Sequence, residues 1–125
     1  MKRLFFLCAC FFTLQAFAQD TTKTKQKEYL GLLTLTEKYK NEKNWTEKDQ
    51  SIVGEHFQRL MKYKKEGIII LAGRTELPLN DSNMMGLVIF YAKDEKEALQ
   101  FMQDDPAVKN KIMLAKALPY SIAIH

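Results

Sequence analysis

One histidine of this sequence is placed where its ring could transfer protons. At about 100° of rotation per helical residue, Val53, Phe57, Leu60 and Met61 form an apolar arc that we expect to face inward, and His56 falls inside this arc. An inward histidine is either a hydrogen-bonded core residue or a residue that takes part in chemistry. A ring that is held by one nitrogen keeps the other nitrogen available as a general acid or base.

A second candidate group follows the strand that we predict at Ile68–Ala72. There the chain reads Gly73-Arg74-Thr75. A guanidinium can hold a carboxylate through two parallel hydrogen bonds. We therefore take Arg74, with Gly73 and Thr75 beside it, as candidate substrate-binding residues for an anionic group. The alternative for Arg74 is an ordinary surface residue at the end of a strand.

Other kinds of site find little support in the sequence. It contains no G-x-S-x-G motif for acyl-enzyme hydrolysis and no glycine-rich phosphate loop. The only other histidine is His125, at the chain end, so we expect no metal site and no cofactor. One tryptophan and scattered lysines do not form a basic aromatic face, so we expect no nucleic acid partner.

The first 18 residues have the layout of a secretory signal peptide. A basic start at Lys2-Arg3 precedes the apolar run Leu4–Leu14, and Ala16-Phe17-Ala18 is a small-x-small cleavage site. We expect cleavage after Ala18, a periplasmic or secreted protein, and no stable membrane insertion afterwards. The alternatives are an uncleaved anchor and a lipid anchor on Cys10, which fits the lipidation pattern poorly.

Cleavage would change the composition of the chain. Both cysteines would be lost, which leaves no disulfide, thiol nucleophile or thiolate metal site. Without Lys2 and Arg3 the formal net charge falls from +4 to +2, so we expect no strong electrostatic attraction to a polyanion. Residues 19–27 are polar and are expected to form a flexible tether. Residues 28–125 are then enough for one domain.

The order of the predicted elements indicates the fold class. A Thr46-x-x-Asp49 capping box, a stop at Gly67 and a cap at Asp94 mark two helices. Strands are expected at 29–36, 68–72, 84–92 and 115–124, helices at 46–65 and 95–103, and a further helical piece at 106–114. This α+β order is the ferredoxin-like βαββαβ arrangement, with both helices on one face of a four-stranded antiparallel sheet. The other face would be apolar and uncovered, so we expect a homodimer.

Three positions in the strands carry further expectations. Gly31 in the first strand indicates either a close approach to the backbone or a bulge. Residues 68–72 are continuously apolar, which predicts a strand that is buried on both faces or lies at a dimer contact. Pro119 in the last strand favours an edge position or a bulge.

Several short motifs, taken in order, resemble the YCII-related domain family of the dimeric α/β-barrel group. The resemblance covers about Glu28 to Ser121. It rests on His56-Phe57-x-x-Leu60, Glu66-Gly67, Ala72-Gly73, Glu97-Ala98 and Asp105-Pro106. It departs from the family at Arg74, where members usually have a proline.

The resemblance implies that His56 and Asp105 form a catalytic pair. An aspartate bonded to one imidazole nitrogen would set the tautomer and leave the other nitrogen free to move a proton. Such a pair suits elimination, isomerisation or lactone opening, and some relatives are similar to dehydrochlorinases that act on hydroxylated aromatic rings. The expected function is thus an exported, cofactor-independent lyase or isomerase acting on a small phenolic or lactone-like molecule.

The alternative is a dimeric module that binds a small ligand without catalysis. His56 would then be a hydrogen-bonded core residue, and Asp105 would cap the helix that begins at Pro106. The two hypotheses differ in geometry. A catalytic site needs His56 and Asp105 within hydrogen-bond reach and open to a cavity, whereas a cap needs Asp105 turned to the amides of its own helix.

Overall fold

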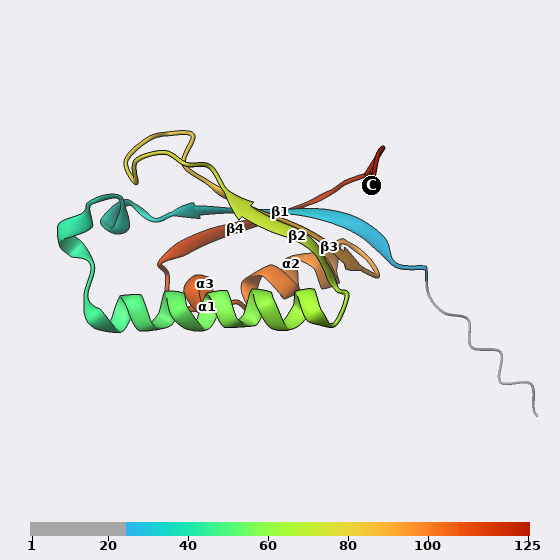
Figure 1. Cartoon of the computed structure of the whole chain (residues 1–125), viewed down its shortest axis with the longest axis horizontal. Coiled ribbons are helices and arrows are strands. Elements are labelled where there is room, and N and C mark those ends of the chain that lie inside the picture. Colours follow the sequence, from blue (N-terminus) through green and yellow to red (C-terminus); the bar gives the residue numbers. More distant parts are fainter. Residues whose placement is uncertain (1–24) are drawn as a thin grey trace, which may run out of the picture.

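The computed structural model of this protein describes residues 25–125. The predicted signal peptide and all of the predicted tether up to residue 24 lie outside the described residues and stay predictions. The elements in chain order are β1 (Lys27–Leu35), the short 3₁₀ turns η1 (Glu37–Lys40) and η2 (Glu42–Asn44), α1 (Glu47–Lys65), β2 (Ile69–Arg74), β3 (Gly86–Ala92), α2 (Glu95–Gln103), α3 (Pro106–Lys109) and β4 (Met113–Pro119) (Figure 1).

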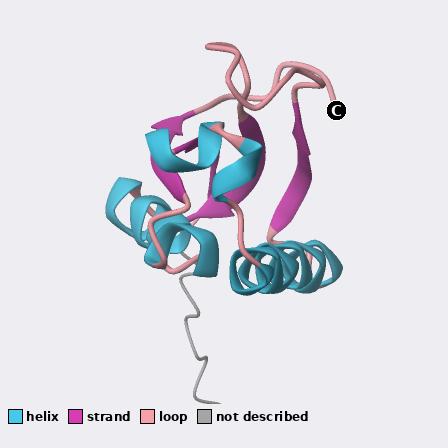
Figure 2. Ribbon diagram, turned by 90° about the vertical axis from the view of Figure 1, so that its left-hand side faces the viewer, coloured by secondary structure: helices cyan, strands magenta, loops and turns pink. Residues whose placement is uncertain are grey.

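The four strands form one antiparallel sheet in the order β2-β3-β1-β4. The helices lie together on one side of this sheet, as Figures 1 and 2 show from two directions. This arrangement confirms the predicted ferredoxin-like α+β fold. Within residues 25–125, no helix combines the length and the apolar character that are needed to cross a membrane.

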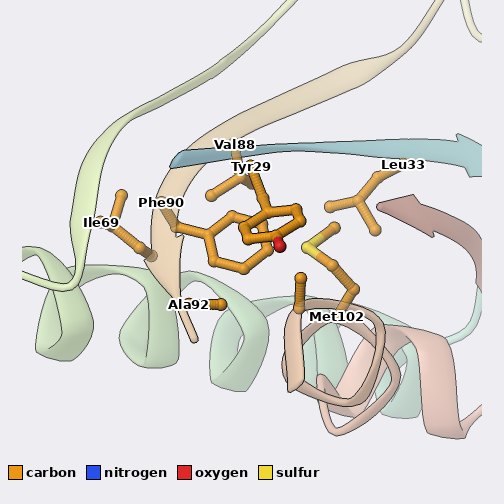
Figure 3. Close-up of a cluster of buried hydrophobic side chains, with 8 residues drawn as sticks. Tyr29, Leu33, Ile69, Val88, Phe90, Ala92 and Met102 are labelled. Atoms are coloured by element: carbon orange, nitrogen blue, oxygen red, sulfur yellow. The ribbon is translucent and has the colours of Figure 1, made fainter. Parts of the chain in front are cut away.

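The hydrophobic core lies between the central strands and α2. Alternate residues of β1 and β3 point to the helical side, because side chains alternate between the faces of a strand. Tyr29, Leu33, Val88 and Phe90 pack there against Met102 of α2 (Figure 3). Phe90 is fully buried.

Gly31 is explained by a close approach and not by a bulge. A Cβ atom at this position would collide with the thioether end of Met102 and would press on the ring of Phe90. The pairing of β1 with β3 continues through Gly31 without a break in register. The glycine therefore lets α2 pack directly onto the sheet.

The region after α2 differs from the prediction. The helical piece expected at 106–114 ends at Lys109, and the strand expected at 115–124 runs from Met113 to Pro119. Lys111 has a φ of 57°, a left-handed conformation that reverses the chain two residues before β4 begins. Pro119 is the last residue of β4, which is an edge strand. The edge position was one of the two alternatives predicted for this proline, because its ring nitrogen has no hydrogen to donate.

The expectation that residues 68–72 are buried on both faces is wrong. β2 is the outer strand of the sheet and pairs only with β3. Ile69 is buried against the core, but Leu71 is 47% exposed. After Ile69, the residues of β2 are half-buried or exposed. The alternative of a dimer contact stays a prediction.

The predicted capping box at the start of α1 is confirmed. The Thr46 hydroxyl accepts from the Asp49 amide at 3.2 Å, and the Thr46 amide donates to the Asp49 carboxylate at 2.9 Å. The Tyr39 hydroxyl donates to the other oxygen of this buried carboxylate at 3.1 Å. These bonds, above all the one from the Thr46 amide, lower the pKa of Asp49.

This lowered pKa predicts an acid-dependent stability. An ionised Asp49 stabilises the fold above the ordinary carboxyl pKa of about 4, and the contribution is lost as the pH falls through the lower pKa of the folded protein. We expect Asp49→Asn to be less stable than the wild type at pH 7, with a difference that shrinks towards pH 3. Urea denaturation of both proteins over this range measures it, and a difference independent of pH would contradict the prediction.

Candidate active site

His56 and Asp105 lie in direct contact, although 49 residues separate them in the chain. His56 Nδ1 is 2.7 Å from Asp105 Oδ2, and the two residues are 8% and 2% exposed. His56 lies near the middle of α1, and Asp105 lies immediately before α3. The contact between α1 and α3 therefore builds the pair.

The local sequence holds Asp105 in place. Its side chain caps α3, because Oδ1 accepts from the Ala107 amide at 2.9 Å. Pro106 occupies the first position of α3, where its missing N–H and fixed φ cost nothing. One carboxylate oxygen of Asp105 therefore caps the helix, and the other contacts His56. Asp105 meets the geometric criterion of the helix cap and also the one of the catalytic pair.

The second nitrogen of His56 is left for chemistry. An ionised carboxylate only accepts hydrogen bonds, so we assign the ring proton to Nδ1. In the described part of the chain, every fully buried side-chain nitrogen or oxygen has a hydrogen-bond partner. Nε2 of His56 has no such partner among the described residues, so it is not fully buried. His56 also lines a cavity, and because Nδ1 contacts Asp105, Nε2 is the nitrogen that is left for a ligand there.

Arg59 completes the polar cluster. Its guanidinium lies 3.5 Å from Asp105 Oδ2 and donates to the Phe101 carbonyl at 2.7 Å. The same group lies over the aromatic rings of Phe101 and Tyr63, at 4.5 and 4.9 Å from their centroids. Arg59 therefore balances the buried carboxylate with a charge that is itself held firmly.

The cavity is a groove of about 890 Å³ between α1 and the helical side of the sheet. This volume lies within the range of small-molecule sites. Phe57 and Met61 line it and are 59% and 52% exposed, so the part of the apolar arc that they form opens to the groove and does not face the core as predicted. The other side of α1, with Ile52 and His56, is buried. One part of the apolar arc therefore lines the groove, and the part next to it packs inward.

The three predicted substrate-binding residues do not share one environment. Gly73 and Arg74 line the groove. Thr75 does not, because its hydroxyl is bonded within the connection that follows β2: it donates to the Asn83 carbonyl and accepts from the Met85 amide, both at 2.9 Å. The structure therefore brings Arg74, but not Thr75, to the cavity that His56 lines.

Sequence reasoning did not single out Arg59. Residues three apart on a helix are neighbours, so the spacing from His56 to Arg59 was the available signal. It also missed the lysines at the end of α1, Lys64 and Lys65, and Trp45 before the helix, all of which line the groove. Spacing alone gave no signal for these three.

One comparison with known proteins gives a match. A model of the YCII-related domain family matches residues 18–117, which is most of the chain. The matched region contains His56, Asp105, Arg59 and the groove. A search of curated proteins finds no match.

Proposed function

This chain belongs to the YCII-related domain family, and on this premise we propose that it is a cofactor-independent lyase or isomerase. Its substrate in this proposal is a small phenolic or lactone-like molecule, and His56 and Asp105 are the general acid and base pair. The observation that carries the proposal is the 2.7 Å contact of His56 Nδ1 with Asp105, which leaves Nε2 for a ligand in the groove. The neighbouring Arg59 supports this role because it balances the carboxylate that holds the ring.

The proposed step moves one proton and needs no redox partner. Nε2 of His56 takes a proton from a carbon of the substrate, and the C–H electron pair forms a double bond. In an elimination, the leaving group departs with its own bonding pair and the protonated ring then releases its proton to it or to water. In an isomerisation, the pair of an existing neighbouring double bond shifts to the next carbon and takes up there the proton that the ring returns. Asp105 stabilises the imidazolium between these events, as a carboxylate next to a charged ring does.

Deuterium exchange tests the proposal even while the product is unidentified. The protein is incubated in D₂O with a panel of small phenolic and lactone acids, and the spectra are followed by proton NMR. We expect at least one compound to lose a C–H signal or to form product faster than in buffer. Compounds that bind without exchange or product would contradict the enzyme and favour the alternative, a ligand-binding module.

A homodimer belongs to the same proposal. The sheet face away from the helices carries Leu114 and Leu118, which are 59% and 45% exposed, and Leu71 of β2 lies opposite Ile89 on that face. Leu30 pairs with Leu118 there, and its neighbour Tyr29 points to the core. A row of large apolar side chains on one face is typical of a surface that binds a partner, and a second copy offers a matching face.

Light scattering at micromolar concentration should give twice the chain mass. Leu118→Lys should shift the protein towards monomer, because the interface would bury an unpaired charge. Leu99→Lys is the matched control, since Leu99 is a similarly exposed leucine on α2, on the helical side. A wild-type monomer, or equal effects of the two substitutions, would contradict the dimer.

A further inference from the structure

We propose that the groove beside His56 binds an elongated apolar monocarboxylate, with its carboxylate on Arg74 and its apolar chain extending towards Trp45. This inference rests on the proposed function, because it concerns the same site and adds a carboxylate and an apolar chain to the small molecule that we propose there. It is carried by the charges that line the groove and by their positions along α1 and β2.

The charged residues along the groove have one sign. Lys64, Lys65 and Arg74 line it together with His56, and no aspartate or glutamate of residues 25–125 does so. The rest of the lining is mainly apolar. A ligand that complements such walls has an apolar body and a negative group.

Arg74 points to the groove because of its place in the sheet. Its partner across the β2–β3 pair is Gly86, and Gly86 in turn pairs with Leu33 of β1. Leu33 is buried on the helical side. Directly opposed residues share a face of the sheet, so the side chain of Arg74 also lies on the helical side.

Arg74 and His56 lie at the same level along the groove. The Lys64 ammonium donates to the Ile70 carbonyl at 2.7 Å, which places the end of α1 beside the start of β2. From Lys64 back to His56 is about 12 Å along a helix, and from Ile70 to Arg74 is about 13 Å along a strand. β2 runs back over α1 (Figure 1). Since both residues line the groove, we infer that His56 on α1 and Arg74 on β2 stand on facing walls.

The two ends of the groove differ in charge, and this difference sets the direction of the apolar chain. Towards the start of α1, the groove is lined by apolar residues that belong to one hydrophobic cluster: Leu35, Trp45, Val53, Leu79 and Met113. The opposite end carries the two lysines, Lys64 and Lys65. We place the apolar chain at the uncharged end, because burial of its methylenes against apolar walls is favourable in free energy. The carbons next to the carboxylate then face His56.

A set of amphiphiles tests the assignment. Binding of octanoate, decanoate, dodecanoate, dodecanol and dodecyltrimethylammonium to the protein is measured by calorimetry, below their aggregation concentrations. We expect the acids to bind more tightly by about fourfold per added methylene, the factor that corresponds to about 0.8 kcal/mol. Dodecanol should bind at least about tenfold more weakly than dodecanoate, because it lacks the charge-assisted hydrogen bonds. The cationic amphiphile should not bind.

Matched variants place the two ends of the ligand. Arg74→Gln should weaken dodecanoate about tenfold and leave dodecanol unchanged. Lys62→Gln is the matched control, because Lys62 is an exposed lysine of α1 that does not line the groove, and it should leave both affinities unchanged. Trp45 is the only tryptophan of the chain, so its emission reports on the apolar end alone. Failure of all acids to bind, an unaltered affinity in Arg74→Gln, or saturable binding that leaves Trp45 emission unchanged would each overturn the assignment.

The two proposals fail in different ways. Dodecanoate binding without proton exchange on any substrate would contradict the enzyme and support the ligand class. Turnover of a phenolic or lactone compound by a protein that binds no apolar acid would contradict the ligand class alone.

Discussion

Replacing His56 with glutamine should reduce turnover by about a hundredfold to ten-thousandfold, the usual contribution of a positioned acid or base. Glutamine can still donate a hydrogen bond to Asp105 from its amide nitrogen, so the buried carboxylate keeps a partner. It cannot accept and return a proton at neutral pH. The loss should therefore appear in kcat, measured on the compound that the deuterium screen identifies.

The control for this substitution is to show that the variant keeps its fold and its ligand binding. Urea denaturation should show a His56→Gln protein that unfolds cooperatively, and calorimetry should show that it still binds dodecanoate, since Arg74 and the apolar walls are intact. Turnover that survives in this variant would rule out His56 as the acid or base.

Removing the Asp105 side chain should have the largest effect on stability. Asp105→Ala takes away the helix cap of α3 and the carboxylate that contacts both His56 and Arg59. Loss of one partner from a buried charged cluster costs about 3 to 5 kcal/mol, and loss of a cap costs about 1 kcal/mol. We expect the free energy of unfolding to fall by about 3 kcal/mol or more, because these terms overlap.

Asp105→Asn separates the two roles of this residue. Asparagine caps helices as well as aspartate does, so the variant should recover part of the stability that Asp105→Ala loses. It carries no charge to stabilise an imidazolium, so turnover should stay low. Asp104→Ala is the matched control, because Asp104 is an exposed neighbour that only accepts from the Gln100 side chain. Its effect should lie within about 0.5 kcal/mol. Equal stability of the Asn and Ala variants would contradict the capping role, and full activity of Asp105→Asn would contradict the charge.

The sequence by itself determined the elements whose signals are local. The capping box at Thr46, the left-handed Gly67 after α1 and the cap at Asp94 depend on contacts within a few residues, and the structure has all three. The order of strands and helices follows from such signals, and with it the ferredoxin-like fold. The family resemblance added Asp105 as the partner of His56, which no periodicity indicates.

Only the tertiary structure decided which side chains meet. Ile68–Ala72 is apolar throughout, yet its position at the edge of the sheet leaves part of β2 exposed. Phe57 and Met61 continue the apolar arc of α1 but line a groove, because the sheet covers only one side of that arc. Arg59 looks like a surface residue until α3 brings Asp105 to it. Hydropathy patterns record which face of an element is apolar, whereas the packing of other elements determines whether that face becomes core, groove or surface.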